Sequence, residues 1–78
     1  MNQKTQSKSR FVVCTRNDGY RAALEVHKVY RTLPDRRASA HGMVRVIDES
    51  GEDYLYPGGF FVPIALPSAA VRSFKATG

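Results

Sequence analysis

Residues 43–64 read MVRVIDESGEDYLYPGGFFVPI, and this stretch says most about how the chain folds. The run MVRVID at residues 43–48 is typical of a β-strand. In the acidic turn that follows, Gly51 permits the positive φ that a tight hairpin requires, and YLYP at residues 54–57 returns as the next strand. The sequence therefore predicts a β-hairpin whose tip carries four carboxylates. Such a tip is more often a solvated turn than a site.

The residues after this hairpin predict one more strand and a helix. Pro57 and two glycines force a compact turn, and FFVPI at residues 60–64 forms the last strand. Proline has no N–H to donate, so Pro63 places that strand at a sheet edge. LPSAAVRSFK at residues 66–75 predicts a short C-terminal helix that packs against the end of the sheet. The helix would direct four apolar side chains there: Leu66, Ala70, Val71 and Phe74.

The N-terminal half predicts a tail and two strands. Residues 1–9 are polar and basic, which predicts a disordered tail, and the fold begins near Arg10. RFVVCTR is the first strand, and NDG at residues 17–19 closes it with a tight turn. AALEVHKVYRT at residues 22–32 alternates apolar and polar side chains, which predicts a second strand with a bulge near Lys28. After it, Pro34 ends the strand, Asp35 caps one helical turn at residues 38–41, and Gly42 ends that turn.

Five short strands separated by turns predict an all-β domain built as a small five-stranded barrel. The stretch at residues 43–64 resembles the second half of an SH3-like barrel, with an acidic distal turn, Pro57, two small residues and the aromatic Phe60. We therefore expect residues 10–78 to form a single SH3-like barrel domain with a short C-terminal helix. The segment VIDESGEDYLYP at residues 46–57 is also similar to segments of short uncharacterised bacterial proteins. The expected core positions are Leu24, Val26, Val44, Val46, Leu55, Phe61 and Ile64.

The charge and the cysteine content indicate which partners and which cellular compartment to expect. The formal net charge is +5, yet residues 47–57 contain Asp48, Glu49, Glu52 and Asp53 with no basic residue. A positive balance favours polyanions through long-range attraction, or it serves only solubility. The single cysteine excludes an internal disulfide framework, and the start of the chain has no apolar segment of a signal peptide. With no run long enough to span a bilayer, these features predict a cytoplasmic protein.

The sequence offers little for catalysis or for a cofactor. Cys14, His27 and His41 are not paired at metal-ligand spacing, so we expect no metal site. Cys14 lies in an apolar strand, where an inert buried thiol is the usual case. The glycines of PGGFF run into a strand, and so they do not form a phosphate-binding loop. We expect a protein that is not an enzyme and that needs no cofactor.

Two kinds of binding remain open. As a protein-interaction module, the chain would resemble SH3 domains that grip proline-rich peptides, although it has no tryptophan and the turn at residues 17–19 is shorter than the long first SH3 loop. Pairing of a partner strand with a sheet edge, or contact of a basic surface with an acidic partner, stays open beside that mode. The candidate partner-binding residues are Tyr54, Tyr56, Pro57 and Phe60, though the two tyrosines could instead fill the core.

The alternative is weak, largely sequence-independent nucleic-acid binding, in which a basic face contacts phosphates and tyrosines such as Tyr20 or Tyr30 stack on bases. Its candidate residues are Arg16, Arg21, Arg31, Arg36, Arg37 and Arg45.

Overall fold

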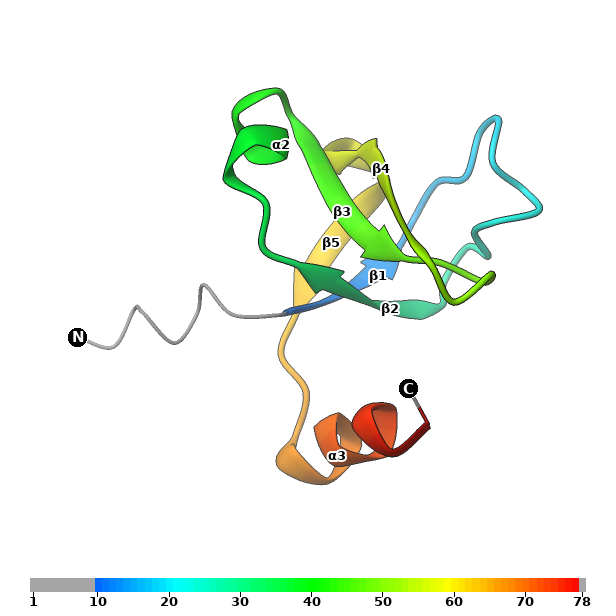
Figure 1. Ribbon diagram of the computed structural model, residues 1–78. Coiled ribbons are helices and arrows are strands. Elements are labelled where there is room, and N and C mark those ends of the chain that lie inside the picture. The colour runs from blue at the N-terminus through cyan, green and yellow to red at the C-terminus, as the bar shows by residue number, and fades with distance from the viewer. Residues whose placement is uncertain (1–9, 78) are drawn as a thin grey trace.

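Five antiparallel strands form one sheet in the order β4-β3-β2-β1-β5, with β4 and β5 at its edges (Figure 1). The computed structural model describes residues 10–77, so the tail expected at residues 1–9 lies outside the described residues. The chain is all-β in its main layer, as the sequence predicts. Its elements are β1 (Arg10–Cys14), β2 (Val29–Leu33), α2 (Arg36–Ala40), β3 (Met43–Ile47), β4 (Asp53–Pro57), the 3-10 turn η1 (Gly58–Phe60), β5 (Phe61–Ile64) and α3 (Ser68–Thr77).

The main hydrophobic cluster lies on one face of this sheet. Strand alternation places Val12 opposite Tyr30 and Val44 opposite Tyr56, so these side chains share that face. Leu24 and Phe60 reach the same cluster from outside the strands and close it over. The buried members of the cluster are Val12, Cys14, Leu24, Tyr30, Val46, Tyr56, Phe60 and Phe61.

The hairpin and the last strand form as the sequence predicts. Gly51 has a φ of 86° at the tip between β3 and β4, a backbone conformation that residues with a Cβ rarely adopt. Pro63 lies in the edge strand β5, where its missing N–H leaves no ladder bond broken. Local turn chemistry is therefore sufficient to define this half of the fold.

The strand expected at residues 22–32 is wrong for its first half. Only Val29–Leu33 is a strand, and residues 15–28 form a long loop closed by turns. The loop forms because Leu24 donates its N–H to the Tyr20 carbonyl (2.9 Å), while the Asn17 side chain donates to the Leu24 carbonyl (3.0 Å). These bonds take the place of ladder bonds, and Leu24 is buried without being in a strand. Instead of a bulge at Lys28, His27 adopts a φ of 71° just before β2.

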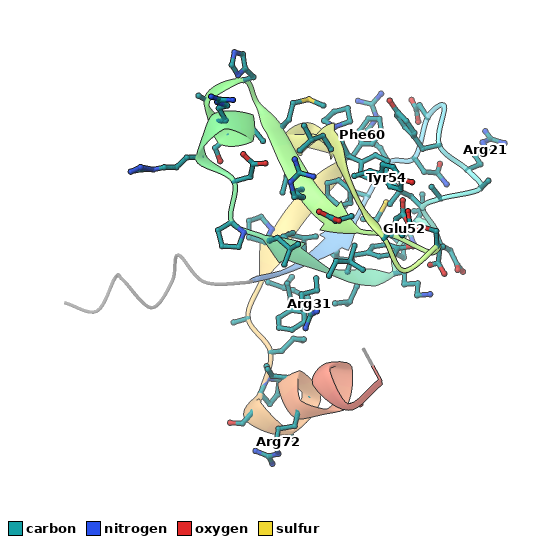
Figure 2. All side chains as sticks on the ribbon, viewed as in Figure 1. Arg21, Arg31, Glu52, Tyr54, Phe60 and Arg72 are labelled. Atoms are coloured by element: carbon teal, nitrogen blue, oxygen red, sulfur yellow. The ribbon has the colours of Figure 1, made fainter. Side chains whose placement is uncertain are left out.

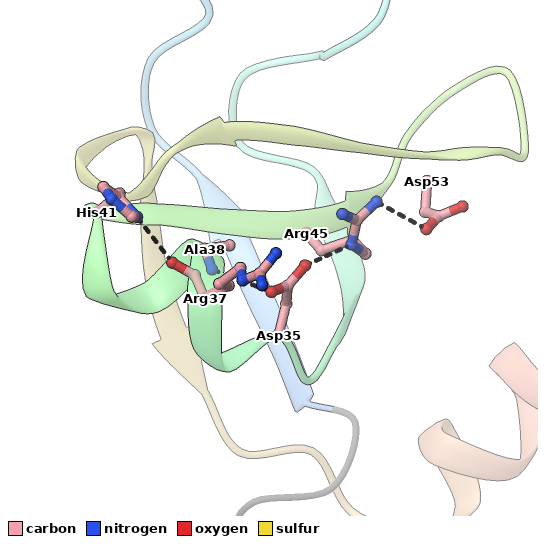
Figure 3. Close-up of polar contacts among 6 residues, drawn as sticks. All are labelled: Asp35, Arg37, Ala38, His41, Arg45 and Asp53. Carbon is pink, nitrogen blue, oxygen red and sulfur yellow. Dashed lines mark hydrogen bonds and ion pairs between the residues drawn. The ribbon is translucent and has the colours of Figure 1, made fainter.

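Helix α2 packs beside β3 and is held there by an ion network (Figure 3). Asp35 is its N-cap, since its Oδ1 accepts the Ala38 N–H at 2.9 Å. The Oδ2 of the same carboxylate accepts from Arg45 Nε at 2.8 Å, and Arg45 also pairs with Asp53 at 3.2 Å. The cap expected from the sequence is therefore confirmed, and its second oxygen ties the helix to the hairpin.

Helix α3 stands apart from the sheet in Figure 1, joined to β5 by residues 65–67. It begins two residues later than expected, because the Pro67 carbonyl accepts the N–H groups of Ala70 and Val71 to form its first turn. Leu66 lies before the helix and is partly buried, as are Ala70 and Val71. The side chain of Phe74 lies outside what the structure describes.

The predicted core is confirmed in part. Leu24, Val46 and Phe61 are buried, and Val44 packs against the cluster while partly exposed. Leu55 is 40% exposed, so its assignment to the core is wrong. It lies on the face of β4 opposite to Tyr56, and the main hydrophobic cluster lies on the Tyr56 face. The two remaining expected positions, Val26 and Ile64, are partly buried.

Candidate functional site

An open hollow of about 570 Å³ lies between the loop at residues 15–28 and the β3–β4 hairpin. We call it the tyrosine hollow. One wall is the loop, and the other is the hairpin, which includes the edge strand β4. It is lined by Tyr20, Ala22, Ala23, Asp48, Glu49, Ser50, Tyr54, Leu55 and Tyr56.

The floor of the tyrosine hollow is a buried hydrogen-bonded pair. Tyr56 is 3% exposed and donates its hydroxyl to Asp48 Oδ2 at 2.5 Å, while Asp48 is 6% exposed. Ser50 donates both its hydroxyl (2.6 Å) and its N–H (2.9 Å) to Asp48 Oδ1. Burial acts to raise the pKa of Asp48, but the hydrogen bonds from Ser50 and Tyr56 outweigh it and the pKa is lowered. Asp48 is therefore a satisfied structural carboxylate, which corrects the expectation of a fully solvated acidic turn.

A second hydrogen-bonded group joins the two walls. Tyr30 accepts the Glu25 N–H (2.8 Å) and donates its hydroxyl to Glu49 Oε2 (2.5 Å). Lys28 Nζ lies 2.7 Å from the same oxygen, and the Glu49 N–H donates to the Ala23 carbonyl at 3.0 Å. The bonds from Lys28 and Tyr30 lower the pKa of Glu49. The loop is thereby fixed against the hairpin, and these bonds set the shape of the hollow.

Two tyrosines of the lining remain open to solvent. Tyr20 is 41% exposed and packs edge-on against the floor ring of Tyr56, with ring centroids 5.0 Å apart. Tyr54 is 50% exposed and donates its hydroxyl to Glu52 Oε1 at 3.0 Å, beside the hairpin tip (Figure 2). Half-exposed aromatic rings on a braced support are typical of recognition surfaces.

The structure brings together two of the four predicted partner-binding residues. Tyr54 and Tyr56 both line the tyrosine hollow, although Tyr56 is its buried floor. Pro57 and Phe60 do not line it. Phe60 is 8% exposed because Tyr20 packs against its ring (6.0 Å) and the Arg16 guanidinium lies over it (5.4 Å).

Sequence reasoning placed Tyr20 only among the base-stacking tyrosines and did not identify the other residues of the loop wall, Ala22 and Ala23. Their signal lies in the turn formed by Asn17, Asp18 and Gly19, which folds the following segment back toward the hairpin. The tyrosine ring next to such a turn is therefore a candidate for a surface contact.

The predicted basic residues are spread over several elements. Arg16 pairs with Asp18 at 2.8 Å, and Arg45 pairs with Asp35 and Asp53. Arg21 lies in the first loop and Arg31 in β2, far apart in Figure 2. The other two, Arg36 and Arg37, lie on α2 and are exposed.

Other reactive side chains do not form a cluster in the described part of the chain. Cys14 is fully buried and free, and burial raises the pKa of its thiol. His27 and His41 are exposed, the first in the loop before β2 and the second at the end of α2. Within residues 10–77, no three histidine, cysteine or carboxylate side chains lie close enough to hold a metal ion.

Neither α2 nor α3, the helices within the described range, has the length and apolar character needed to cross a bilayer. Comparisons with protein families, characterised proteins and solved structures found no match to this chain.

Proposed function

We propose that this protein is a small non-catalytic interaction module that binds a segment of a partner protein in the tyrosine hollow. One observation carries the proposal: Tyr20 and Tyr54 stay 41% and 50% exposed above a floor whose polar groups already have their partners. An exposed tyrosine adds large contact area at low entropic cost, and tyrosine is enriched at binding hot spots. The braced floor lets a partner bind without first rearranging the domain.

The size of the hollow sets the expected strength of binding. A volume of about 570 Å³ admits a few side chains and not a whole domain face. A contact of this size falls in the small class of interfaces that form weak and transient complexes. We accordingly assign the protein to reversible recognition of a short segment.

We also propose that the fold is an SH3-like barrel. The order of strands, the acidic hairpin turn and the 3-10 turn at Gly58–Phe60 before the last strand support it. SH3 domains have a long first loop, whereas the sequence predicts only a tight turn at residues 17–19. Residues 15–28 form a long loop at this place, which supports the proposal. The chain still lacks tryptophan, so the proposal does not extend to proline-rich ligands. The single free cysteine supports a cytoplasmic location as part of the same proposal.

Nucleic-acid binding is the weaker proposal because of where the arginines lie. Two of the six candidates, Arg16 and Arg45, already pair with carboxylates, and the remaining four lie on three separate elements. A phosphate backbone is held best by several cations along one path. The exposed tyrosines also line a hollow whose charged groups, Asp48 and Glu49, are both acidic.

A peptide selection tests the proposal. A phage library of random peptides is panned on the immobilised full-length protein, and the enriched peptides are measured against Tyr54→Ala and Val62→Ala. Val62 is 48% exposed on β5 and does not line the hollow, so its variant is a matched control.

We expect enriched peptides that lose at least about tenfold in affinity with Tyr54→Ala and nothing with Val62→Ala. Far-ultraviolet circular dichroism checks that both variants are folded. Failure to enrich any peptide, or equal binding to wild type and both variants, would refute the proposed function.

A further inference from the structure

We propose that the segment bound in the tyrosine hollow is positively charged, with an arginine or lysine side chain lying against the Tyr54 ring beside Glu52 and Glu49. This inference rests on the proposed function and names the chemistry of its partner. It follows from three features of the hollow: the sign of its charge, its exposed rings, and the carboxylate that still has room for a donor.

The charge of the tyrosine hollow is opposite to that of the chain. Its lining contains Asp48 and Glu49, of which Glu49 pairs with Lys28, and Glu52 is hydrogen-bonded to Tyr54 of the lining. The whole chain carries a formal net charge of +5. A cationic segment is therefore repelled by the protein as a whole and attracted at this place, so complementarity determines where it binds.

The three carboxylates differ in what they can still accept. Asp48 is buried and already accepts from Tyr56 and Ser50, so it contributes charge and not a contact. Glu49 shares one oxygen between Tyr30 and Lys28. Glu52 is exposed, and its Oε1 accepts from Tyr54. Among the described residues, no donor is assigned to Glu52 Oε2, which is therefore open to a ligand cation.

The exposed rings complete a site for a cation. A cation over the face of a tyrosine is attracted by the ring quadrupole, more strongly when water is excluded. The chain already uses this contact twice, with Arg16 over Phe60 at 5.4 Å and Lys28 over Tyr30 at 5.8 Å. Tyr54 offers a half-exposed ring with an acceptor next to it. Arginine fits better than lysine, because its planar guanidinium stacks on a ring and donates to a carboxylate at the same time.

The experiment compares peptides that differ in one charge. Peptides enriched on the wild-type protein are synthesised with arginine or with citrulline at each basic position, and fluorescence anisotropy measures their affinity for the full chain. Citrulline keeps the shape of arginine and removes its positive charge.

The same peptides are measured against Glu52→Gln, Tyr54→Leu and Asp18→Asn. Asp18 is an exposed carboxylate that pairs with Arg16 and does not line the hollow, so its variant controls for a general loss of negative charge.

We expect the enriched peptides to be richer in arginine and lysine than the library. Citrulline should weaken binding by about tenfold, Glu52→Gln and Tyr54→Leu should each weaken the arginine form severalfold, and Asp18→Asn should change nothing.

If arginine and citrulline peptides bind equally well and both depend on Tyr54, the hollow is a peptide site and the inference about charge is wrong. Arginine-dependent binding that responds to Asp18→Asn and not to Glu52→Gln overturns the location. If no peptide is enriched, the proposed function fails together with the inference.

Discussion

Replacing Tyr56 by phenylalanine tests whether the floor of the tyrosine hollow is held as the structure indicates. The change removes one hydroxyl and keeps the ring, whose edge contacts with Tyr20 (5.0 Å) and Phe61 (6.3 Å) remain. Asp48 Oδ2 then loses the Tyr56 hydroxyl as a donor. Ser50 does not replace it, because both bonds from Ser50 go to Oδ1. Asp48 is only 6% exposed, so water replaces that donor poorly.

A buried hydrogen bond to a charged group contributes about 1.5–3 kcal/mol. We expect Tyr56→Phe to lower the free energy of unfolding by about 2 kcal/mol, a large share of what so small a domain has. Tyr54→Phe is the matched control, since its hydroxyl bonds to Glu52 at the surface, and it should leave the unfolding midpoint unchanged. Urea unfolding followed by circular dichroism measures both variants.

The pH dependence gives a second check on this account. Asp48 has a lowered pKa in the folded protein, so its stabilising contribution is complete above its ordinary pKa of about 4 and is lost as the pH falls through the folded value. The difference between wild type and Tyr56→Phe should therefore shrink in acid. Equal midpoints for Tyr56→Phe and Tyr54→Phe at neutral pH would show that the Tyr56–Asp48 bond does not hold the floor.

Three further predictions test other parts of the structure. Gly51→Ala should cost about 1–2 kcal/mol of unfolding free energy because residue 51 has a φ of 86°, whereas Gly59→Ala, in open space and without positive φ, should cost little; thermal unfolding of both variants decides this. Tyr30 and Tyr56 have raised pKa values, Tyr30 through burial and its bond to Glu49 and Tyr56 through burial and its bond to Asp48. Both should therefore stay neutral when ordinary tyrosines ionise near pH 10, and stability should fall as the pH rises further; ultraviolet titration showing four equivalent tyrosines would contradict this. Phe61→Ala should cost about 3–5 kcal/mol because its ring is buried, and Val62→Ala, on the exposed side of the same strand, should cost little in urea unfolding.

The fold could be predicted from the sequence wherever local turn chemistry decides it. Gly51 requires positive φ, Asp35 caps the helix that follows it, and Pro63 suits an edge strand, and the structure contains all three. The strand at residues 22–32 was predicted wrongly because a loop that buries Leu24 can show the same alternation as a strand. The hydrogen bonds that Asn17 and Tyr20 make with Leu24 distinguish the two, and the alternation of side chains does not reveal them.

The tyrosine hollow could be predicted only in part for a related reason. Alternation correctly places Tyr54 and Tyr56 on one face of β4, since they lie opposite Val46 and Val44. It does not show which tyrosine is covered. Tyr20 returns from a distant loop to cover Tyr56 and leaves Tyr54 half exposed. Asp48 is buried while its carboxylate accepts the Tyr56 hydroxyl, although the sequence alone places it in an exposed acidic turn.

The proposed function requires the tyrosine hollow to be the surface at which this protein meets its partner. Titrating the full chain with an enriched peptide, while following the amide and tyrosine-ring signals by NMR, tests it most directly. We predict that the largest shifts fall at Tyr20, Ala22 and Ala23 and at residues 48–50 and 54–56, which line the hollow. Shifts centred instead on Arg31, Arg36 and Arg37, with the signals of Tyr20 and Tyr54 unchanged, would contradict the claim.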